Sequence, residues 1–134
     1  MKDRYVLILG AGLMQRPSFE AAHELGFKTL VVDANPEAVC VPFADRFELI
    51  DLKDYKKIAE LALSVKENLA GVVTAGTVFS ASVSYVASEC SLPSHKFEAC
   101  INASDKIKMR ECFKKEGVPS PEFTEISRSQ IAAF

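Results

Sequence analysis

The stretch YVLILGAG, residues 5–12, is the part of the sequence from which the fold can be predicted. Its first five residues form a continuous apolar run, as expected for a strand that is covered on both faces. Gly10-Ala11-Gly12 follows directly and allows a tight turn, and Pro17 lies where a helix can begin because its missing N–H costs nothing in the first turn. The stretch therefore predicts a buried strand, a glycine loop and a helix, in that order.

Short apolar strands and helical patterns alternate along the rest of the chain. Further strands are predicted at 27–32, 47–50 and 71–74, and helices are predicted from Pro17 to a Gly26 cap, after Asp51 or Asp54, over 78–90, over 95–101, and from a Ser104 cap onward. Helical spacing predicts two sets of inward-facing side chains, Phe19, Ala22 and Leu25 in the first helix and Ile58, Leu61, Ala62, Val65 and Leu69 in the second.

This alternation defines the fold class. Fully apolar strands separated by helices indicate a parallel sheet that is covered on both faces. Right-handed crossovers place the first strand centrally. We therefore predict an α/β fold, a Rossmann-like open parallel sheet with helices on both faces and the strand order 3-2-1-4.

The composition is that of a globular domain. With 134 residues, 49% of them hydrophobic and 25% charged, the chain is long enough to bury a core. Its net charge of −2 gives no global attraction to nucleic acid or to a membrane surface, and no apolar run approaches the ~20 residues that span a bilayer. The four scattered cysteines are expected to be reduced, buried thiols of a cytoplasmic protein: Cys40, Cys90, Cys100 and Cys112.

A ligand crevice is predicted where the order of the strands reverses. Ligands of open parallel sheets bind beyond the carboxyl ends of the strands at that point. Gly10-Ala11-Gly12 after the first strand and Ala75-Gly76-Thr77 after the fourth are expected to meet there. Glycines let a ligand approach the backbone closely, although the same glycines are also compatible with turns that bind nothing.

A dinucleotide site is the alternative for this crevice. Asp33 follows Gly10 by 23 residues, near the ~20 expected for an acid that binds a ribose. The G-x-G-x-x-G fingerprint is broken, however, because its third glycine position is Gln15. A nicotinamide-binding oxidoreductase domain therefore remains an alternative, as does a domain of the same fold without any site.

The second informative stretch is residues 102–123, NASDKIKMRECFKKEGVPSPEF. It predicts a basic amphipathic helix that ends at Gly117 and continues into an extended, proline-containing segment. Met109, Cys112 and Phe113 mark its apolar stripe. Lys106 lies in the first turn, where a positive charge opposes the helix dipole, which indicates an anion nearby.

The pattern D-K-x-x-M-R-x-x-F-x-x-x-G-V-P-x-P-x-F at residues 105–123 resembles the junction between the two N-terminal domains of ATP-grasp enzymes. The upstream chain is similar to their pre-ATP-grasp domain, through the strand–GAG–helix opening, VVDANPEA at 31–38, FADRFELIDLKD at 43–54, and the TAGT and LP elements at 74–77 and 92–93. Among these enzymes, the sequence patterns resemble those of carbamoyl phosphate synthetase large-subunit-like proteins, biotin carboxylases and phosphoribosylamine–glycine ligases.

The resemblance implies ATP-dependent ligation, in which a small-molecule carboxylate forms an acyl phosphate that an amine, ammonia or another nucleophile captures. It divides the chain into a Rossmann-like pre-ATP-grasp domain (1–101) and a connecting helix with the start of an ATP-grasp domain (102–134). Lys106 matches the lysine that reaches the nucleotide phosphates. The residues matching those that border the acceptor substrate are Gly10, Ala11, Gly12, Gly76 and Thr77.

The same resemblance implies what this chain lacks. The adenine pocket and the magnesium-binding carboxylates of the family lie beyond the GVPSPEF stretch, so ATP and Mg²⁺ are expected to bind only in the full-length enzyme. No catalytic residue or metal ligand is assigned here. We expect the chain to be inactive alone, as an engineered truncation or a split subunit, and to work with an ATP-grasp domain in cis or on another subunit, with homodimerisation left open.

Overall fold

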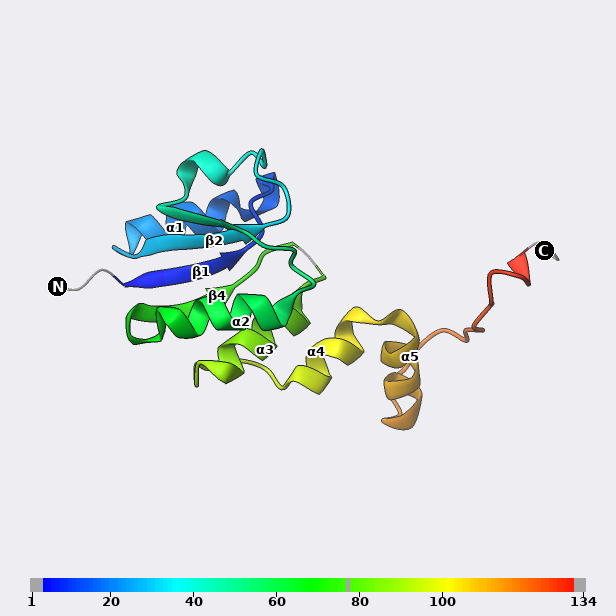
Figure 1. Ribbon diagram of the computed structural model, residues 1–134. Coiled ribbons are helices and arrows are strands. Elements are labelled where there is room, and N and C mark those ends of the chain that lie inside the picture. Colours follow the sequence, from blue (N-terminus) through cyan, green and yellow to red (C-terminus); the bar gives the residue numbers. More distant parts are fainter. Residues whose placement is uncertain (1–3, 77, 132–134) are drawn as a thin grey trace.

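The computed structural model describes residues 4–76 and 78–131, and within them one four-stranded parallel sheet has the order β3-β2-β1-β4 (Figure 1). The strands are β1 (Tyr5–Leu9), β2 (Lys28–Asp33), β3 (Arg46–Leu49) and β4 (Leu69–Val73). The α-helices are α1 (Arg16–Glu24), α2 (Tyr55–Ser64), α3 (Ser80–Glu89), α4 (Phe97–Ser104) and α5 (Lys106–Lys115), and short 3-10 turns form η1 (Leu13–Gln15), η2 (Val41–Phe43) and η3 (Lys66–Asn68). The predicted fold class and strand order are confirmed.

Two hydrophobic cores lie on opposite faces of the sheet, because successive side chains of a strand point to opposite sides. Leu7 and Leu30, paired in register, face α2 and α3 and contribute to the larger core. Ile8 and Val31, one residue further along, face α1 and contribute to the smaller one. Buried side chains of the larger core include Leu9, Val32, Ile58, Ala62 and Val86; those of the smaller include Ala11, Phe19 and Cys40.

The end of α1 follows the predicted glycine cap. Gly26 has a φ of +77°, which only glycine adopts without strain. Its N–H donates to His23 O, and the next N–H, of Phe27, donates to Ala22 O. These two hydrogen bonds form a Schellman motif, which turns the chain directly from α1 into β2.

Three details of the predicted elements are wrong. Leu25 is 74% exposed, because it is the C-cap residue and the chain turns away before another buried position is reached. Leu69 is not on a helix: α2 ends at Ser64, and Leu69 begins β4. Ser104 does not cap α5; the cap is Asp105, whose Oδ1 accepts hydrogen bonds from the N–H groups of Ile107 and Lys108.

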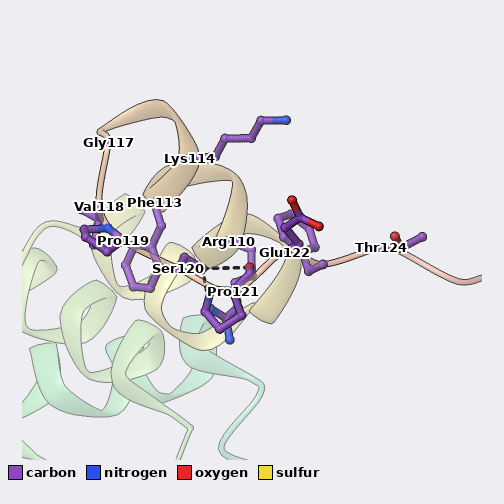
Figure 2. Close-up of a pocket in the computed structure, with 11 residues that line it drawn as sticks. Arg110, Phe113, Lys114, Gly117, Val118, Pro119, Ser120, Pro121, Glu122 and Thr124 are labelled. Atoms are coloured by element: carbon purple, nitrogen blue, oxygen red, sulfur yellow. Dashed lines mark hydrogen bonds between the residues drawn. The ribbon is translucent and has the colours of Figure 1, made fainter.

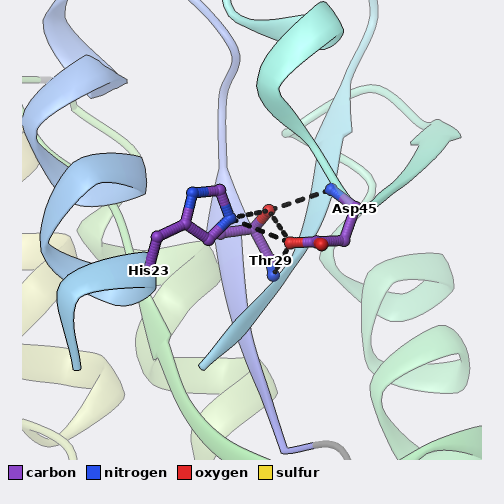
Figure 3. Close-up of polar contacts among 3 residues, drawn as sticks. All are labelled: His23, Thr29 and Asp45. Atoms are coloured by element: carbon purple, nitrogen blue, oxygen red, sulfur yellow. Dashed lines mark hydrogen bonds and ion pairs between the residues drawn. The ribbon is translucent and has the colours of Figure 1, made fainter. Parts of the chain in front are cut away.

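A polar network joins α1, β2 and the loop before β3 (Figure 3). Asp45 Oδ2 lies 2.9 Å from His23 Nε2 and accepts hydrogen bonds from the N–H and the hydroxyl of buried Thr29 at 2.8 and 3.0 Å. Burial acts to raise the pKa of Asp45, but hydrogen bonds from Thr29 and His23 outweigh it and hold that pKa below its ordinary value of 3.8. The ionised carboxylate therefore stabilises the amino-terminal half of the sheet.

The carboxy-terminal part is built differently. α5 packs against α4, and the extended segment after it runs away from the sheet (Figure 1). No described residue from 101 to 131 is buried. The predicted division at 101/102 falls inside α4, and it remains a prediction. Among the described residues, no helix is long and apolar enough to cross a membrane.

Candidate functional site

The two predicted substrate loops lie at one edge of the sheet. β1 and β4 are neighbouring parallel strands, and the strand order reverses between them. Their carboxyl ends continue into the glycine loop, Gly10–Gly12, and into Ala75–Gly76. Thr74, which follows β4, donates its hydroxyl hydrogen bond to Leu9 O at 2.8 Å. Thr77, the remaining residue predicted for substrate binding, lies outside the described residues.

Gln15 connects the two loops across this crevice. Its side chain is only 2% exposed. Oε1 accepts a hydrogen bond from Ala75 N–H at 2.8 Å, and Nε2 donates to Ala75 O. A Cβ built on Gly10 would lie 3.3 Å from Gln15 Cγ, so the first loop is in close contact with the same side chain. The residue that breaks the dinucleotide fingerprint thus contacts both loops.

Two N–H groups of the glycine loop have partners within the domain. The N–H of Gly10 donates to Val32 O at 2.8 Å, and the N–H of Ala11 donates to Asp33 Oδ2 at 2.7 Å. The other oxygen of Asp33 accepts from Asn35 N–H at 2.8 Å. Asp33 therefore holds a turn and the first loop together, and the dinucleotide alternative is not supported.

Cys40 is a contact of the first loop that the sequence did not predict. Its N–H donates to Ala11 O at 2.9 Å, and its Sγ lies 3.3 Å from Gly12 O. Burial raises the pKa of the Cys40 thiol, although the charge of Arg16 acts in the opposite direction. The thiol is thus kept protonated as a donor to the loop, and the only sequence signal for it was its apolar surroundings.

The predicted phosphate-contacting residue, Lys106, is exposed at the first position of α5. It is tied to the β4 side of the crevice through its neighbours. Ser104, two residues earlier, has its Oγ 3.2 Å from Ser80 Oγ and 3.3 Å from Val78 O. The structure therefore brings the start of α5 against the segment that follows Gly76, although these parts of the chain are about 25 residues apart.

A large cavity, of about 600 Å³, lies on the carboxy-terminal stretch (Figure 2). Phe113 and the extended segment Gly117–Thr124 line most of it. Arg110 donates to Ser120 Oγ at 2.5 Å and so fixes the segment against α5 (Figure 2). Lys106 does not line this cavity.

Metal ligands do not gather in the part of the chain that the structure describes. No group of three or more His, Cys, Asp or Glu residues there could hold a metal ion. The described residues do not fit a magnesium site.

These features define a class: a Rossmann-like domain in which a glutamine side chain joins the loops after the first and fourth strands. No family model matches the chain. A 3-methyl-D-ornithine–L-lysine ligase from Methanosarcina barkeri is 34% identical over 117 residues, which cover 78% of this chain and 30% of that protein. The enzyme of the same name from Methanosarcina acetivorans is 33% identical over 115 residues, with the same coverage.

Solved structures agree with these matches. Phosphoribosylglycinamide synthetase from Anaerococcus prevotii superposes with a TM-score of 0.78 at 28% identity, covering 98% of this chain and 34% of that one. An L-amino acid ligase from Bacillus licheniformis gives 0.69 at 20% identity, covering 94% and 33%. The chain therefore has the fold of about a third of each of these ligases. It spans about 30% of the length of the curated relatives it matches.

Proposed function

We propose that this chain is the acceptor-substrate domain of an ATP-dependent carboxylate–amine ligase that proceeds through an acyl phosphate. The carboxylate is an amino acid or a similar small molecule. Support for this comes from the relatives, which by name are a 3-methyl-D-ornithine–L-lysine ligase and an L-amino acid ligase. A further domain, in cis or on a separate subunit, binds ATP and Mg²⁺ and completes the catalytic site.

The contact between Ser104 and the segment after Gly76 is the observation that carries the proposal. It holds the end of α4, directly before α5, against the segment that follows Gly76, with Oγ of Ser104 and Oγ of Ser80 3.2 Å apart. A carboxylate bound between Gly10–Gly12 and Gly76 would be presented toward a phosphate held by Lys106. Positioning of this kind, together with neutralisation of phosphate charge, is the main catalytic demand of phosphoryl transfer.

In this scheme the residues have separate roles. Gly10, Ala11, Gly12 and Gly76, with Thr77, border the acceptor. Lys106 supplies positive charge to the nucleotide phosphates, and the Asp105 cap fixes the first turn of α5 from which it projects. Residues 1–101 form the acceptor domain, and 102–134 form the connection toward the ATP-binding part.

The test compares two lysines of the same helix. In the enzyme formed with the ATP-binding domain, Lys106→Ala should lower kcat/KM for carboxylate-dependent ADP release by about 100-fold, the scale of losing one charge-stabilising donor. Lys108→Ala, an equally exposed lysine two positions further, should leave it within about twofold. Equal effects of the two substitutions would refute the role of Lys106.

A second measurement tests the need for a partner domain. The 134-residue chain incubated with ATP, Mg²⁺ and amino acids should release no ADP above background. Turnover by the purified chain would show that the catalytic half is not required.

A further inference from the structure

Another cavity, of about 590 Å³, lies beside the outer edge of the sheet. β4 is the last strand in the order β3-β2-β1-β4, so no described strand pairs with its outer side. The walls of the cavity come from the end of β4, from α3, from the loop between α3 and α4, and from α4. Its volume lies in the range of sites that bind small molecules.

The loop between α3 and α4 is held in place as one wall of this cavity. The hydroxyl groups of Ser84 and Ser94 both donate to His95 O, at 2.5 and 2.8 Å. Pro93 has no N–H and cannot donate a hydrogen bond to the edge of β4. The loop therefore lines the cavity without forming a strand that would fill it.

The walls are mostly apolar. The apolar side chains that line the cavity are Val72, Val73, Val83, Pro93 and Cys100. Among the described residues, no Asp, Glu, Lys or Arg side chain lines it, and His95 is the one basic side chain in the wall. A charged group that entered this cavity would lose water without gaining a partner of opposite charge there. The lining therefore suits an uncharged aliphatic group.

The hydroxyl groups of the wall give their protons to the fold. Besides Ser84 and Ser94, Thr74 donates to Leu9 O at 2.8 Å. Ser104 donates to Cys100 O at 2.8 Å, which leaves its oxygen to accept from the Ser80 hydroxyl at 3.2 Å. A hydroxyl group whose proton is already used can only accept a further hydrogen bond. A ligand that these oxygens hold must therefore be a hydrogen-bond donor.

We propose that this cavity binds a small molecule with an uncharged aliphatic body and a neutral hydrogen-bond donor, as in an aliphatic primary amide. The body contacts the valines of β4 and α3, and the donor reaches the hydroxyl oxygens of the wall. An alkylammonium ion also donates, but no described carboxylate lines the cavity, and Lys106, two residues beyond Ser104, is of like charge. The site is separate from the loops assigned to the acceptor under the proposed function.

The experiment is a titration of the ¹⁵N-labelled 134-residue chain, followed by NMR through the backbone amides of Thr74, Val83 and His95. The ligands are hexanamide, acetamide, which has the same amide on a much shorter chain, and hexylammonium, which has a similar chain and a charge. Hexanamide should shift all three amides and reach saturation. Acetamide should bind at least about tenfold more weakly because it buries less hydrocarbon, and hexylammonium at least about tenfold more weakly because its charge is desolvated.

Substitutions in the wall give the matched comparison. Val73→Thr keeps the shape of the side chain but makes it polar, and it should weaken hexanamide binding about threefold; adding Val83→Thr should bring the loss to about tenfold. Val39→Thr makes the same change at an exposed valine outside the cavity and should leave binding unchanged. Unchanged amide positions for Leu7 and Leu30, in the central strands, report that each variant is folded.

Three results would overturn the inference: no saturable response to hexanamide, binding of acetamide or hexylammonium as tight as that of hexanamide, or full hexanamide affinity in the folded Val73→Thr variant. The titration needs neither ATP nor turnover and involves neither the glycine loop nor the Lys106 side chain. Its failure therefore leaves the Lys106 test standing, and failure of that test leaves the titration interpretable.

Discussion

The side chain of Gln15 binds the backbone of Ala75 through both of its amide atoms, although the two residues are 60 positions apart in the sequence. This contact fastens the loop after the first strand to the loop after the fourth. It also occupies the space that a Rossmann domain with a third glycine leaves open for a pyrophosphate. One side chain thus joins the two loops and explains why this edge of the sheet does not suit a dinucleotide.

Gln15→Ala should destabilise the domain by about 3 kcal/mol, because it leaves both backbone groups of Ala75 without partners and opens a small cavity. Urea unfolding measures the loss. Gln130→Ala removes the same atoms from an exposed glutamine, whose Oε1 accepts from Ser127, and should cost less than about 0.5 kcal/mol. Similar losses at both positions would show that the contact with Ala75 contributes no stability.

Gly10→Ala should lower the stability of the domain, whereas Gly12→Ala should leave it unchanged or raise it. Gly10 has a φ of +104° and Gln15 Cγ near its missing Cβ, so alanine there should cost at least about 1–2 kcal/mol. Gly12 has a φ of −72° and nothing within 4 Å of a built Cβ, so alanine there should be neutral or stabilising by about 0.5 kcal/mol. Thermal unfolding of the two variants measures both changes. A lower unfolding temperature for Gly10→Ala alone would show that only Gly10 requires glycine.

Asp45 should make the stability of the domain depend on pH in the acid range. Its pKa in the folded state is below the ordinary 3.8, so the ionised carboxylate stabilises the fold above that pH, and this contribution is lost as the pH falls through the folded-state value. Asp45→Asn should unfold more easily at neutral pH, and its stability should converge with that of the unmodified chain in strong acid. Urea midpoints measured from pH 7 to pH 2 test this.

The control for that series is Asp51→Asn. Asp51 is an exposed carboxylate that accepts a hydrogen bond from Lys53 N–H, and its replacement should change the stability at neutral pH by less than about 0.5 kcal/mol. If Asp45→Asn did not alter the dependence of stability on pH, the network of Asp45 with His23 and Thr29 would not be the cause of that dependence.

Asp105→Ala should loosen the first turn of α5. It removes the acceptor for the N–H groups of Ile107 and Lys108, a cap that contributes about 1 kcal/mol. The ¹³Cα shifts of α5 should move toward coil values. Ser104→Ala, one residue earlier, should not change them, since the Ser104 hydroxyl contacts Cys100 O and Ser80 instead of the α5 backbone. If Ser104→Ala moved the ¹³Cα shifts and Asp105→Ala did not, Ser104 would be the N-cap of α5.

Local patterns were sufficient for most of the fold. The apolar runs, the helical spacing of Phe19 and Ala22, and the glycine that ends α1 each depend on neighbours a few residues away, and the handedness of crossovers then sets the strand order. The error in the cap of α5 came where one position decides between near-equivalent residues. Ser104 and Asp105 are both good caps, and the choice depended on α4 continuing through Ser104.

The sequence alone determined the parallel sheet, its order and the placing of two loops at one edge, because these follow from periodicity and chain geometry. The tertiary structure decided what those loops can do. Gln15, Asp33 and Cys40 are separated in sequence from the groups they hold. Only folding showed that Gln15 hydrogen-bonds Ala75, that Asp33 accepts from Ala11 N–H, and that Cys40 contacts Gly12 O. Satisfaction of buried polar groups is a property of the whole domain, and no local pattern encodes it.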